Sequence, residues 1–365
     1  MKKINNEFFK GAILKNNEAL FDEFKPSISE FRIGGDNFFK ISPNTPHHDI
    51  SERITKIVFS QVEINSSACG FVQGKSYFDF LKPHIHGYYF LRLDIKKFFH
   101  SIKISDVSAL LEDCFSNEKG KFKYSPYDIA LMSVTHKVSS NFSDIKLREK
   151  DILPIGLPSS PVISNIIFRR VDILIQKYCE NKKITYSRYA DDLLFSSLNS
   201  NFIHSENFER EISFFLSCLS LRLNHKKRKA CENTISLNGY VIKNSKPKKL
   251  DFFNIHKEDP VGKISLSNKK LKIIKKIIHH LKKGSSAITI MEELFYLNFN
   301  KNRSKFYNYY GFYQKYAEDQ LQNKLKGYRS YLLSLVIFHQ KNKCVDELCL
   351  RTVKKMIKDI NKKIV

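Results

Sequence analysis

Three aspartates in two short stretches are the residues of this chain best suited to chemistry. Asp94 closes a stretch, LRLD, in which Leu91 and Leu93 alternate with polar residues as they do in a β-strand. Asp191 and Asp192 are adjacent in YADD, between two stretches rich in β-formers, ITYSRY and LLFSS. Neighbouring aspartates are often simple turn residues, because Asp tolerates bends and bonds to its own backbone. Here both flanks are apolar, so the pair is expected near a core, where like charges raise the pKa of one carboxyl group.

A divalent cation would relieve the repulsion between these carboxylates. Mg²⁺ typically binds one or two carboxylates together with the phosphates of a substrate. With Asp94 on a neighbouring strand, the site could hold two Mg²⁺ ions about 3.5–4 Å apart. One ion would activate an attacking hydroxyl and the other would stabilise a leaving pyrophosphate, which is the chemistry of nucleotidyl transfer. Mn²⁺ is the alternative metal, since it also accepts carboxylate oxygen.

A proline- and glycine-containing stretch, LPIGLPSSPVISN, lies between the two acidic stretches at residues 153–165. Gly156 permits close approach of another backbone, and the prolines stiffen the entry to a helix. The small residues Ser159 and Ser160 could cradle a base pair from below. In isolation the stretch is better explained as a loop between helices, but its place between the acidic stretches favours a role in binding.

The elements that must position these residues follow from local patterns. The patterns predict an irregular N-terminal extension with one or two helices over residues 1–50 and a helix from Glu52 to about Ile64. A strand over Tyr88–Asp94 is expected next, followed by a helix through Leu111. Further along, we expect helices over 125–180 interrupted by the Pro-rich stretch, two strands around Ala190–Asp192 and a helix over 205–221.

The charge of the chain favours a polyanionic partner. Its 365 residues contain 62 Lys and Arg against 37 Asp and Glu, a formal net charge of +25. Residues 251–365 contribute +14 of this, from 24 basic and 10 acidic residues, in a Lys-rich amphipathic stretch and the Tyr-rich stretch FYNYYGFYQKY. Such a region could grip a nucleic-acid backbone and stack on bases, although most of the aromatics are expected in a core. A solvated basic surface without a partner is the alternative.

Cysteine usage and hydropathy favour a soluble, cytoplasmic protein that does not enter a membrane. The seven cysteines are scattered, and no pair has the spacing of a zinc site, so we expect reduced thiols. The first residues lack an apolar run of signal-peptide length, and the longest apolar run, near Leu335–Phe338, is far too short to span a bilayer.

Taken in order, these stretches resemble the motifs of reverse transcriptases, and in particular the bacterial retron-type group. LRLDIKKFF is similar to the motif around the first catalytic Asp, GLPSSPVISN to the template- and nucleotide-binding loop, and YSRYADDLLFSS to the YxDD hairpin. LRLNHKKRK, which contains Asn224 and Lys227, resembles the next palm motif. GFVQGKS, followed by His84, resembles the segment before the first catalytic strand. The resemblance covers about residues 65–250.

The resemblance implies an α+β right-hand polymerase with fingers, a palm built on an antiparallel sheet, and a helical thumb. The corresponding ranges are 1–50 for an N-terminal extension or fingers, 51–250 for fingers and palm, and 251–365 for a basic, RNA-binding thumb. It makes Asp94, Asp191 and Asp192 the metal ligands, with the backbone carbonyl of Ile95 as a further ligand.

The resemblance also implies a set of nucleotide- or template-binding residues: Phe99, Gly156, Leu157, Pro158, Ser160, Tyr189 and Lys227. Phe99 falls at the steric-gate position, where a ring crowds a ribose 2′-OH and favours dNTPs; ordinary core packing is the alternative. Tyr189 would lie along the primer terminus, and Lys227 would assist the leaving pyrophosphate.

The chain departs from the family pattern at several places. Ile155 stands where many relatives have Gln, and Leu237-Asn238-Gly239 replaces Val-Thr-Gly. The Asn-Ala-x-x-His element is reduced to the segment ending at His84. The candidates for the basic residues of the fingers are Arg32, Lys40 and Arg53.

By this resemblance, the protein is expected to be an RNA-directed DNA polymerase. It would copy part of a structured noncoding RNA that also supplies the priming 2′-OH, giving a branched RNA–DNA product (msDNA), and would act with a separate effector protein in antiphage defence. The alternatives are another defence-associated reverse transcriptase that makes repetitive or untemplated DNA, a non-enzymatic RNA-binding scaffold, and, less favoured, a group II intron maturase, whose zinc or His-Asn nuclease module is not seen after the thumb.

Overall fold

The computed structural model describes residues 3–33, 36–246, 259–297 and 310–364. The chain divides into two compact units, which are described separately. The first unit comprises residues 1–83 and 90–230, and the second comprises residues 84–89 and 231–365. Among the described helices, none has both the length and the apolar character needed to cross a membrane.

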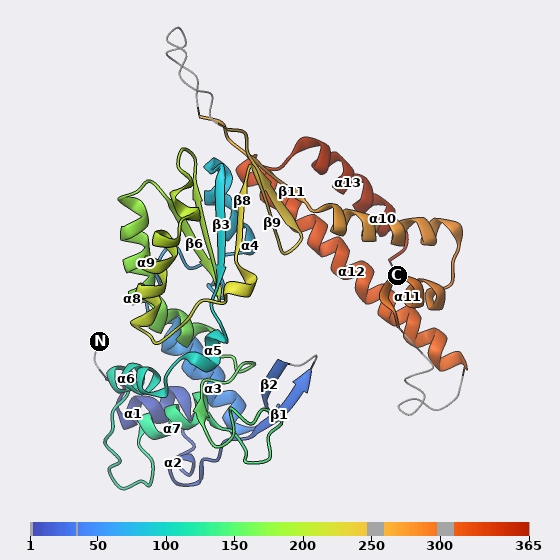
Figure 1. The fold of residues 1–365 in the computed structure, drawn as a ribbon. Coiled ribbons are helices and arrows are strands. Elements are labelled where there is room, and N and C mark those ends of the chain that lie inside the picture. Colours follow the sequence, from blue (N-terminus) through green and yellow to red (C-terminus); the bar gives the residue numbers. More distant parts are fainter. Residues whose placement is uncertain (1–2, 34–35, 247–258, 298–309, 365) are drawn as a thin grey trace. The chain divides into compact units, whose positions relative to one another are not determined.

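A four-stranded sheet carries the acidic stretches, with its strands in the order β6-β7-β3-β8 (Figure 1). These strands are β3 (Tyr89–Asp94), β6 (Thr185–Tyr189), β7 (Asp192–Ser197) and β8 (Lys229–Glu232). Strands β6 and β7 form an antiparallel hairpin in which Tyr189 pairs with Asp192. Every residue of β7 is buried, because the strand lies inside the sheet and is rich in apolar residues.

Helix α8 (Ser160–Glu180) packs against β6 and against helix α9 (Glu206–Ser217) (Figure 1). A proline in its first turn favours the start of α8, since the missing N–H would have no partner in the helix. Apolar residues on one face, among them Phe168, Val171 and Ile175, are buried. The predicted strand–turn–strand and the helix after the Pro-rich loop are confirmed.

The first unit also contains a β-hairpin that the sequence did not lead us to expect. The hairpin consists of β1 (Ile28–Ile33) and β2 (Asp36–Ile41) and pairs Ile28 with Ile41. Phe39 and Ile41 of β2 are buried in an apolar cluster with Phe142, Leu147 and Leu157. The other elements of the unit include α1 (Asn6–Phe8), a π-helical turn (Phe9–Ile13), α2 (Leu20–Glu23), α3 (Pro46–Ile57), α4 (Tyr77–Leu81), α5 (Phe98–Ser101), α6 (Ile104–Cys114), α7 (Pro126–Val134), β4 (His136–Lys137) and β5 (Asp151–Ile152).

The second unit combines a three-stranded antiparallel sheet with helices. The sheet has the order β11-β10-β9, formed by β9 (Thr234–Leu237), β10 (Tyr240–Lys243) and β11 (Lys263–Leu266). The helices are α10 (Asn268–Lys283), α11 (Ala287–Phe295), α12 (Tyr310–Asn342) and α13 (Glu347–Asn361). On α10 the isoleucines at 274, 277 and 278 are buried while most lysines are exposed. The predicted amphipathic helix is therefore present.

The mixture of helices and antiparallel sheets confirms the predicted α+β class. The predicted ranges 1–50, 51–250 and 251–365 remain a prediction, and the boundary at residue 250 lies outside the described residues, as does the first part of the Tyr-rich stretch.

Candidate active site

Two neighbouring strands bring the acidic residues together at the same end of the sheet. Asp94 is the last residue of β3, and Asp191 and Asp192 occupy the turn and the first position of β7. The backbone N–H of Ile95 donates to the carbonyl oxygen of Asp191 at 2.9 Å, so the two acidic stretches are bonded directly to each other. Asp94 and Asp192 are only 2% and 7% exposed, as expected from their apolar flanks.

Cationic and amide side chains donate hydrogen bonds to two of the three carboxylates. The ammonium group of Lys227 and the amide of Asn224 each donate to the Asp94 carboxylate at 3.0 Å. Arg92 binds the Asp192 carboxylate, with its Nε at 2.8 Å. Both carboxylates therefore already face positive charge or a hydrogen-bond donor.

The protonation equilibria reflect a buried acidic site. Burial raises the pKa of Asp191 above its ordinary value, and the charge of Asp94 adds to that effect. Burial also raises the pKa of Asp192, with the Arg92 guanidinium acting in the opposite direction. The hydrogen bond to Asp94 raises the pKa of Lys227. A cation near the carboxylates would therefore stabilise their charged forms.

The donor set fits a hard divalent cation, although the ligands are not gathered into a finished site. Within the described ranges, no three His, Cys, Asp or Glu side chains are grouped as metal ligands. The three aspartates nevertheless supply the oxygen donors that Mg²⁺ or Mn²⁺ requires. Arg92 and Lys227 neutralise the negative charge of two of these carboxylates. Bound metal ions would neutralise the same carboxylates in place of these side chains.

A cavity of about 530 Å³ opens beside these carboxylates. Its lining includes Asp94, Asp191, Asn224, Lys227, Ile95 and Phe99, together with Asn37, Asp144 and Ile155 from more distant parts of the chain. This volume lies in the range of small-molecule sites. Five of the predicted site residues therefore share one cavity: Asp94, Ile95, Phe99, Asp191 and Lys227.

Phe99 occupies a half-buried position in this cavity, next to the acidic residues. Its ring centroid lies 5.3 Å from that of the buried Phe98 and 6.3 Å from that of Phe71. Core packing would bury the ring completely, whereas this ring remains partly open to the cavity. Its role as a steric gate remains a prediction.

Tyr189 does not line the cavity but belongs to an aromatic cluster beside it. Its ring centroid lies 5.0 Å from Tyr77, 5.9 Å from Phe80 and 6.2 Å from Phe71. The ring is half-buried, so one part of it stays accessible.

The predicted close approach of another backbone at Gly156 of the Pro-rich loop is confirmed. Gly156 has a φ of +110°, and a Cβ there would overlap the carbonyl oxygen of Phe39, so glycine allows the hairpin β1–β2 to approach. The N–H of Phe39 donates to the carbonyl of Ile155 at 2.9 Å, which fastens the loop to β2. Gly156 and Pro158 are exposed.

Two loop residues need a correction, because their side chains are not available to a nucleotide. Leu157 is buried in the apolar cluster around Phe39. Ser160 is buried, and its hydroxyl donates to the carbonyl of Pro154 at 2.7 Å. Both side chains stabilise the loop, so any nucleotide contact at these positions must come from the backbone.

The basic residues proposed for the fingers do not line the cavity either. Arg53 donates to the carbonyl of Ile13 at 2.9 Å and pairs with Asp49, which is a structural role. The lysines that do line the cavity are Lys96, Lys97 and Lys227. His84 is completely buried, and burial lowers its pKa to about 3, so it is a neutral structural histidine.

A buried ion pair that sequence reasoning missed holds the YADD turn. Arg188 and Asp172 are both fully buried, with Nη2 to Oδ2 at 2.7 Å and Nε to Oδ1 at 2.9 Å. The Tyr186 hydroxyl donates to the same carboxylate at 2.7 Å. Arg188 also donates to the carbonyl of Ala190 at 3.1 Å. The pair therefore ties α8 to the backbone between Tyr189 and Asp191.

The sequence carried a signal for Arg92 but not for this pair. Arg92 lies two residues before Asp94 on one strand, so both side chains project from the same face. Arg188 also lies on a predicted strand, but its partner Asp172 lies on a helix. The sequence alone does not show which face of that helix packs against the strand.

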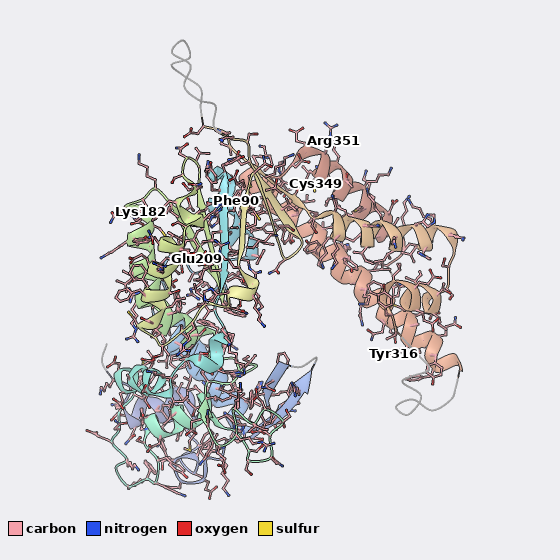
Figure 2. All side chains as sticks on the ribbon, in the orientation of Figure 1. Phe90, Lys182, Glu209, Tyr316, Cys349 and Arg351 are labelled. Carbon is pink, nitrogen blue, oxygen red and sulfur yellow. The ribbon has the colours of Figure 1, made fainter. Side chains whose placement is uncertain are left out.

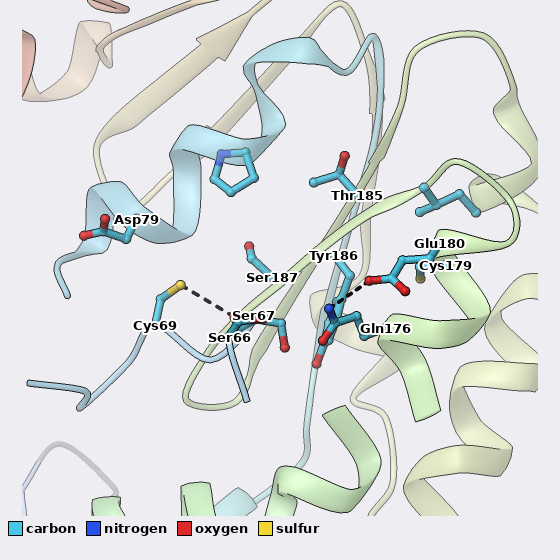
Figure 3. Close-up of a pocket in the computed structure, with 12 residues that line it drawn as sticks. Ser66, Ser67, Cys69, Asp79, Gln176, Cys179, Glu180, Thr185, Tyr186 and Ser187 are labelled. Carbon is cyan, nitrogen blue, oxygen red and sulfur yellow. Dashed lines mark hydrogen bonds between the residues drawn. The ribbon is translucent and has the colours of Figure 1, made fainter. Parts of the chain in front are cut away.

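A second cavity, of about 310 Å³, lies on another part of the first unit and does not have the features of a reaction site. Figure 3 shows Cys69 and Cys179 among the residues around it. The Cys69 thiol donates to the carbonyl of Ser67, and burial raises its pKa to about 11. Burial also raises the pKa of Cys179. Both thiols are therefore protonated at neutral pH and are poor nucleophiles.

Comparison with known proteins assigns the family. Residues 47–252, more than half of the chain, match the family model described as reverse transcriptase (RNA-dependent DNA polymerase). The retron Ec83 reverse transcriptase of Escherichia coli is 33% identical over 160 residues, which cover 43% of this chain and 48% of that protein. The retron Ec73 reverse transcriptase of Escherichia coli is 33% identical over 146 residues, which cover 38% of this chain and 43% of that protein.

The matched region spans less than half the length of these curated relatives. A solved telomerase structure from Candida albicans aligns over 97% of this chain and 68% of that chain, with a TM-score of 0.43 and 13% identity. The predicted resemblance is confirmed by the family model and the relatives. The chain belongs to the reverse transcriptase family, with its α+β right-hand polymerase fold, and is similar to bacterial retron reverse transcriptases.

Proposed function

We propose that this protein is an RNA-directed DNA polymerase that copies part of a structured noncoding RNA into DNA. One observation carries the proposal: Asp94 at the end of β3 and Asp191 in the turn before β7 meet in one cavity beside Phe99, in a chain that matches the reverse transcriptase family. A scaffold without activity has no need to retain buried, mutually repelling carboxylates, because each raises the cost of folding.

The proposed reaction is nucleotidyl transfer assisted by divalent metal ions. Asp94, Asp191, Asp192 and the carbonyl of Ile95 would hold two Mg²⁺ or Mn²⁺ ions. When bound, such ions favour deprotonation of the primer hydroxyl and stabilise negative charge on the leaving group. Lys227 would neutralise or protonate the departing pyrophosphate, and Phe99 would exclude a ribose 2′-OH.

The second unit supplies a basic surface that suits an RNA backbone. Exposed lysines on α10 include Lys272, Lys275, Lys276 and Lys283. Helix α13, which contacts α10, adds Lys354, Lys355 and Arg351, the last of which projects away from its helix (Figure 2). Lysine and arginine neutralise phosphates and release counterions, so this surface favours a nucleic-acid partner.

The similarity to retron enzymes favours the finer features of the proposal. The noncoding RNA would serve as template and provide the priming 2′-OH, so that the product is a branched RNA–DNA molecule (msDNA). We further propose that the protein works in the cytoplasm with a separate effector protein in antiphage defence.

Sequencing of the nucleic acids that accompany the purified protein tests this proposal. The protein is expressed with its flanking genomic DNA, purified, deproteinised, and its RNA and DNA are sequenced with and without RNase treatment. We expect one RNA species and a DNA that copies a single segment of it once and shortens on RNase treatment. Repeats of a short segment, or DNA with no RNA counterpart, would indicate the alternative defence polymerase; a complete absence of bound RNA would contradict the retron-type version.

A further inference from the structure

Phe71 combines an unfavourable backbone with an exposed ring. Its φ is +58°, in the left-handed region that residues with a bulky side chain rarely adopt. The side chain is nevertheless 49% exposed, so burial of the ring does not compensate for the strain. Conformations of this kind cluster at functional sites, where the surrounding structure enforces them.

The backbone before Phe71 is fastened to the strand that carries YADD. The N–H of Cys69 donates to the carbonyl of Arg188 at 2.7 Å. A Cβ on Gly70 would lie 2.7 Å from the backbone nitrogen of Ala190, so only glycine permits this approach. The position of Phe71 is therefore fixed relative to the acidic turn.

The Phe71 ring lies between the aromatic residues of the site and a separate groove. Its centroid is 6.3 Å from that of Phe99 and 6.2 Å from that of Tyr189. Phe71 itself lines a groove of about 430 Å³, and Phe99 lines the cavity that contains the carboxylates. Phe71 thus marks the boundary between the two.

The groove has the chemistry of a path for single-stranded RNA. Its lining includes the polar residues Ser60, Asn65 and Gln73 and two lysines. Lys75 donates to the carbonyls of Ser66 and Ala68 at 2.7 Å each, and Lys56 pairs with Glu52 at 3.5 Å. None of the described residues that line it is a carboxylate. A polar groove with lysines but no carboxylates in its lining and an aromatic ring at its end suits an unpaired strand, since every base has a face that can stack.

We propose that Phe71 is a template-contact residue, and that the template base opposite the incoming nucleotide stacks on its ring. This inference rests on the proposed polymerase function. A nucleotide held in the carboxylate cavity must have its pairing partner at the edge of that cavity, where Phe71 lies. The groove then holds the unpaired template that has not yet been copied.

Glycine and tyrosine substitutions at Phe71 distinguish the contribution of the ring from that of the backbone conformation. Phe71→Gly keeps the left-handed conformation available and removes the ring, while Phe71→Tyr retains an aromatic face. Phe214→Ala, which removes a 65% exposed ring from α9, is the matched control. The probe is a primer–template whose first unpaired template position carries the fluorescent base 2-aminopurine, whose emission falls when it stacks.

We expect wild type, Phe71→Tyr and Phe214→Ala to quench this probe on binding, and Phe71→Gly to leave it bright. For Phe71→Gly, kcat/KM for dNTP incorporation should fall by about 5- to 150-fold, the range of one base–aromatic stack, with no loss in Tm. Quenching and kcat/KM equal to those of wild type in Phe71→Gly would overturn the inference. Binding by wild type without quenching at this position overturns the inference alone, whereas no binding by wild type overturns it together with the proposed function.

Discussion

The two adjacent aspartates in YADD have different surroundings, so their carboxylates are suited to different roles. Asp191 lines the cavity, whereas Asp192 is mostly buried and is bound by Arg92. Burial raises the pKa of both carboxyl groups, and neighbouring positive charge favours their ionised forms. Arg92 supplies that charge for Asp192, and a metal ion would supply it for Asp191.

A substitution at Phe99 should change the choice between deoxyribo- and ribonucleotides. We expect Phe99→Val to lower the dNTP/rNTP ratio of kcat/KM by on the order of 10- to 200-fold, because the smaller side chain leaves room for the 2′-OH. Phe99→Tyr, which retains the ring, should keep the ratio near that of wild type. An unchanged ratio in Phe99→Val would show that the ring is ordinary packing.

At the scale of elements, the first unit depends on two connections to its acidic hairpin: the buried Arg188–Asp172 pair from α8, and the Gly70 segment on the other side. Because both contact the backbone of Ala190, the turn is held from two directions.

Removal of one partner of the buried pair should be costly. Asp172→Asn leaves the Arg188 guanidinium buried without a counterion, so we expect a loss of about 3–5 kcal/mol in the free energy of unfolding. Glu206→Gln, which removes an exposed ion pair with Arg210 on α9, is the control and should cost less than about 1 kcal/mol. Urea unfolding of both variants measures the difference, and equal losses would show that the buried pair is no anchor.

Two glycines with positive φ allow a test of the contact between the Pro-rich loop and β2. Gly156 (φ +110°) faces the carbonyl of Phe39, whereas Gly74 (φ +77°) has no atom within 4 Å of an added Cβ. Both alanine variants carry a backbone cost, but Gly156→Ala should be about 1–3 kcal/mol less stable than Gly74→Ala because of the overlap. Similar urea midpoints for the two variants would contradict the close approach.

Physical reasons explain which strands and contacts could be predicted from the sequence and which could not. β3, β6 and β7 could be predicted because runs of β-formers end directly at the acidic residues. The hairpin β1–β2 was missed, although ISEFRI and DNFFKI flank Gly34–Gly35, a pair of residues typical of tight hairpin turns. The partners of Arg92 and Arg188, and the burial of Leu157 and Ser160, depend on packing between distant segments and could not be predicted.

At the scale of the whole molecule, the net charge of +25 is divided unevenly, and residues 251–365 hold more than half of it. On α10 three of the four isoleucines are buried in the second unit and most of the lysines face solvent. Such an arrangement predicts binding to a polyanion that weakens with salt.

Neutralisation of the α10 lysines should reduce this salt dependence. In a variant with Lys272, Lys275, Lys276 and Lys283 changed to Gln, the slope of log K against log salt should become shallower by about 0.7 for each phosphate of a single strand that the protein no longer neutralises. The same four positions changed to Arg keep the charge and should keep the slope. Fluorescence anisotropy with the cognate RNA measures both, and an unchanged slope in the Gln variant would place the RNA elsewhere.

The central claim is that the cavity beside Asp94 and Asp191 joins deoxynucleotides on an RNA template. The most direct measurement is incorporation of labelled dNTPs by the protein purified with its co-expressed RNA, compared with Asp191→Asn and with Asp113→Asn, an exposed position on α6. We expect labelled DNA from wild type and Asp113→Asn, and a rate lower by on the order of 100-fold or more for Asp191→Asn, because several kcal/mol of charge stabilisation are removed. DNA synthesis by Asp191→Asn at the wild-type rate, or none by any of the three proteins with RNA bound, would contradict the claim.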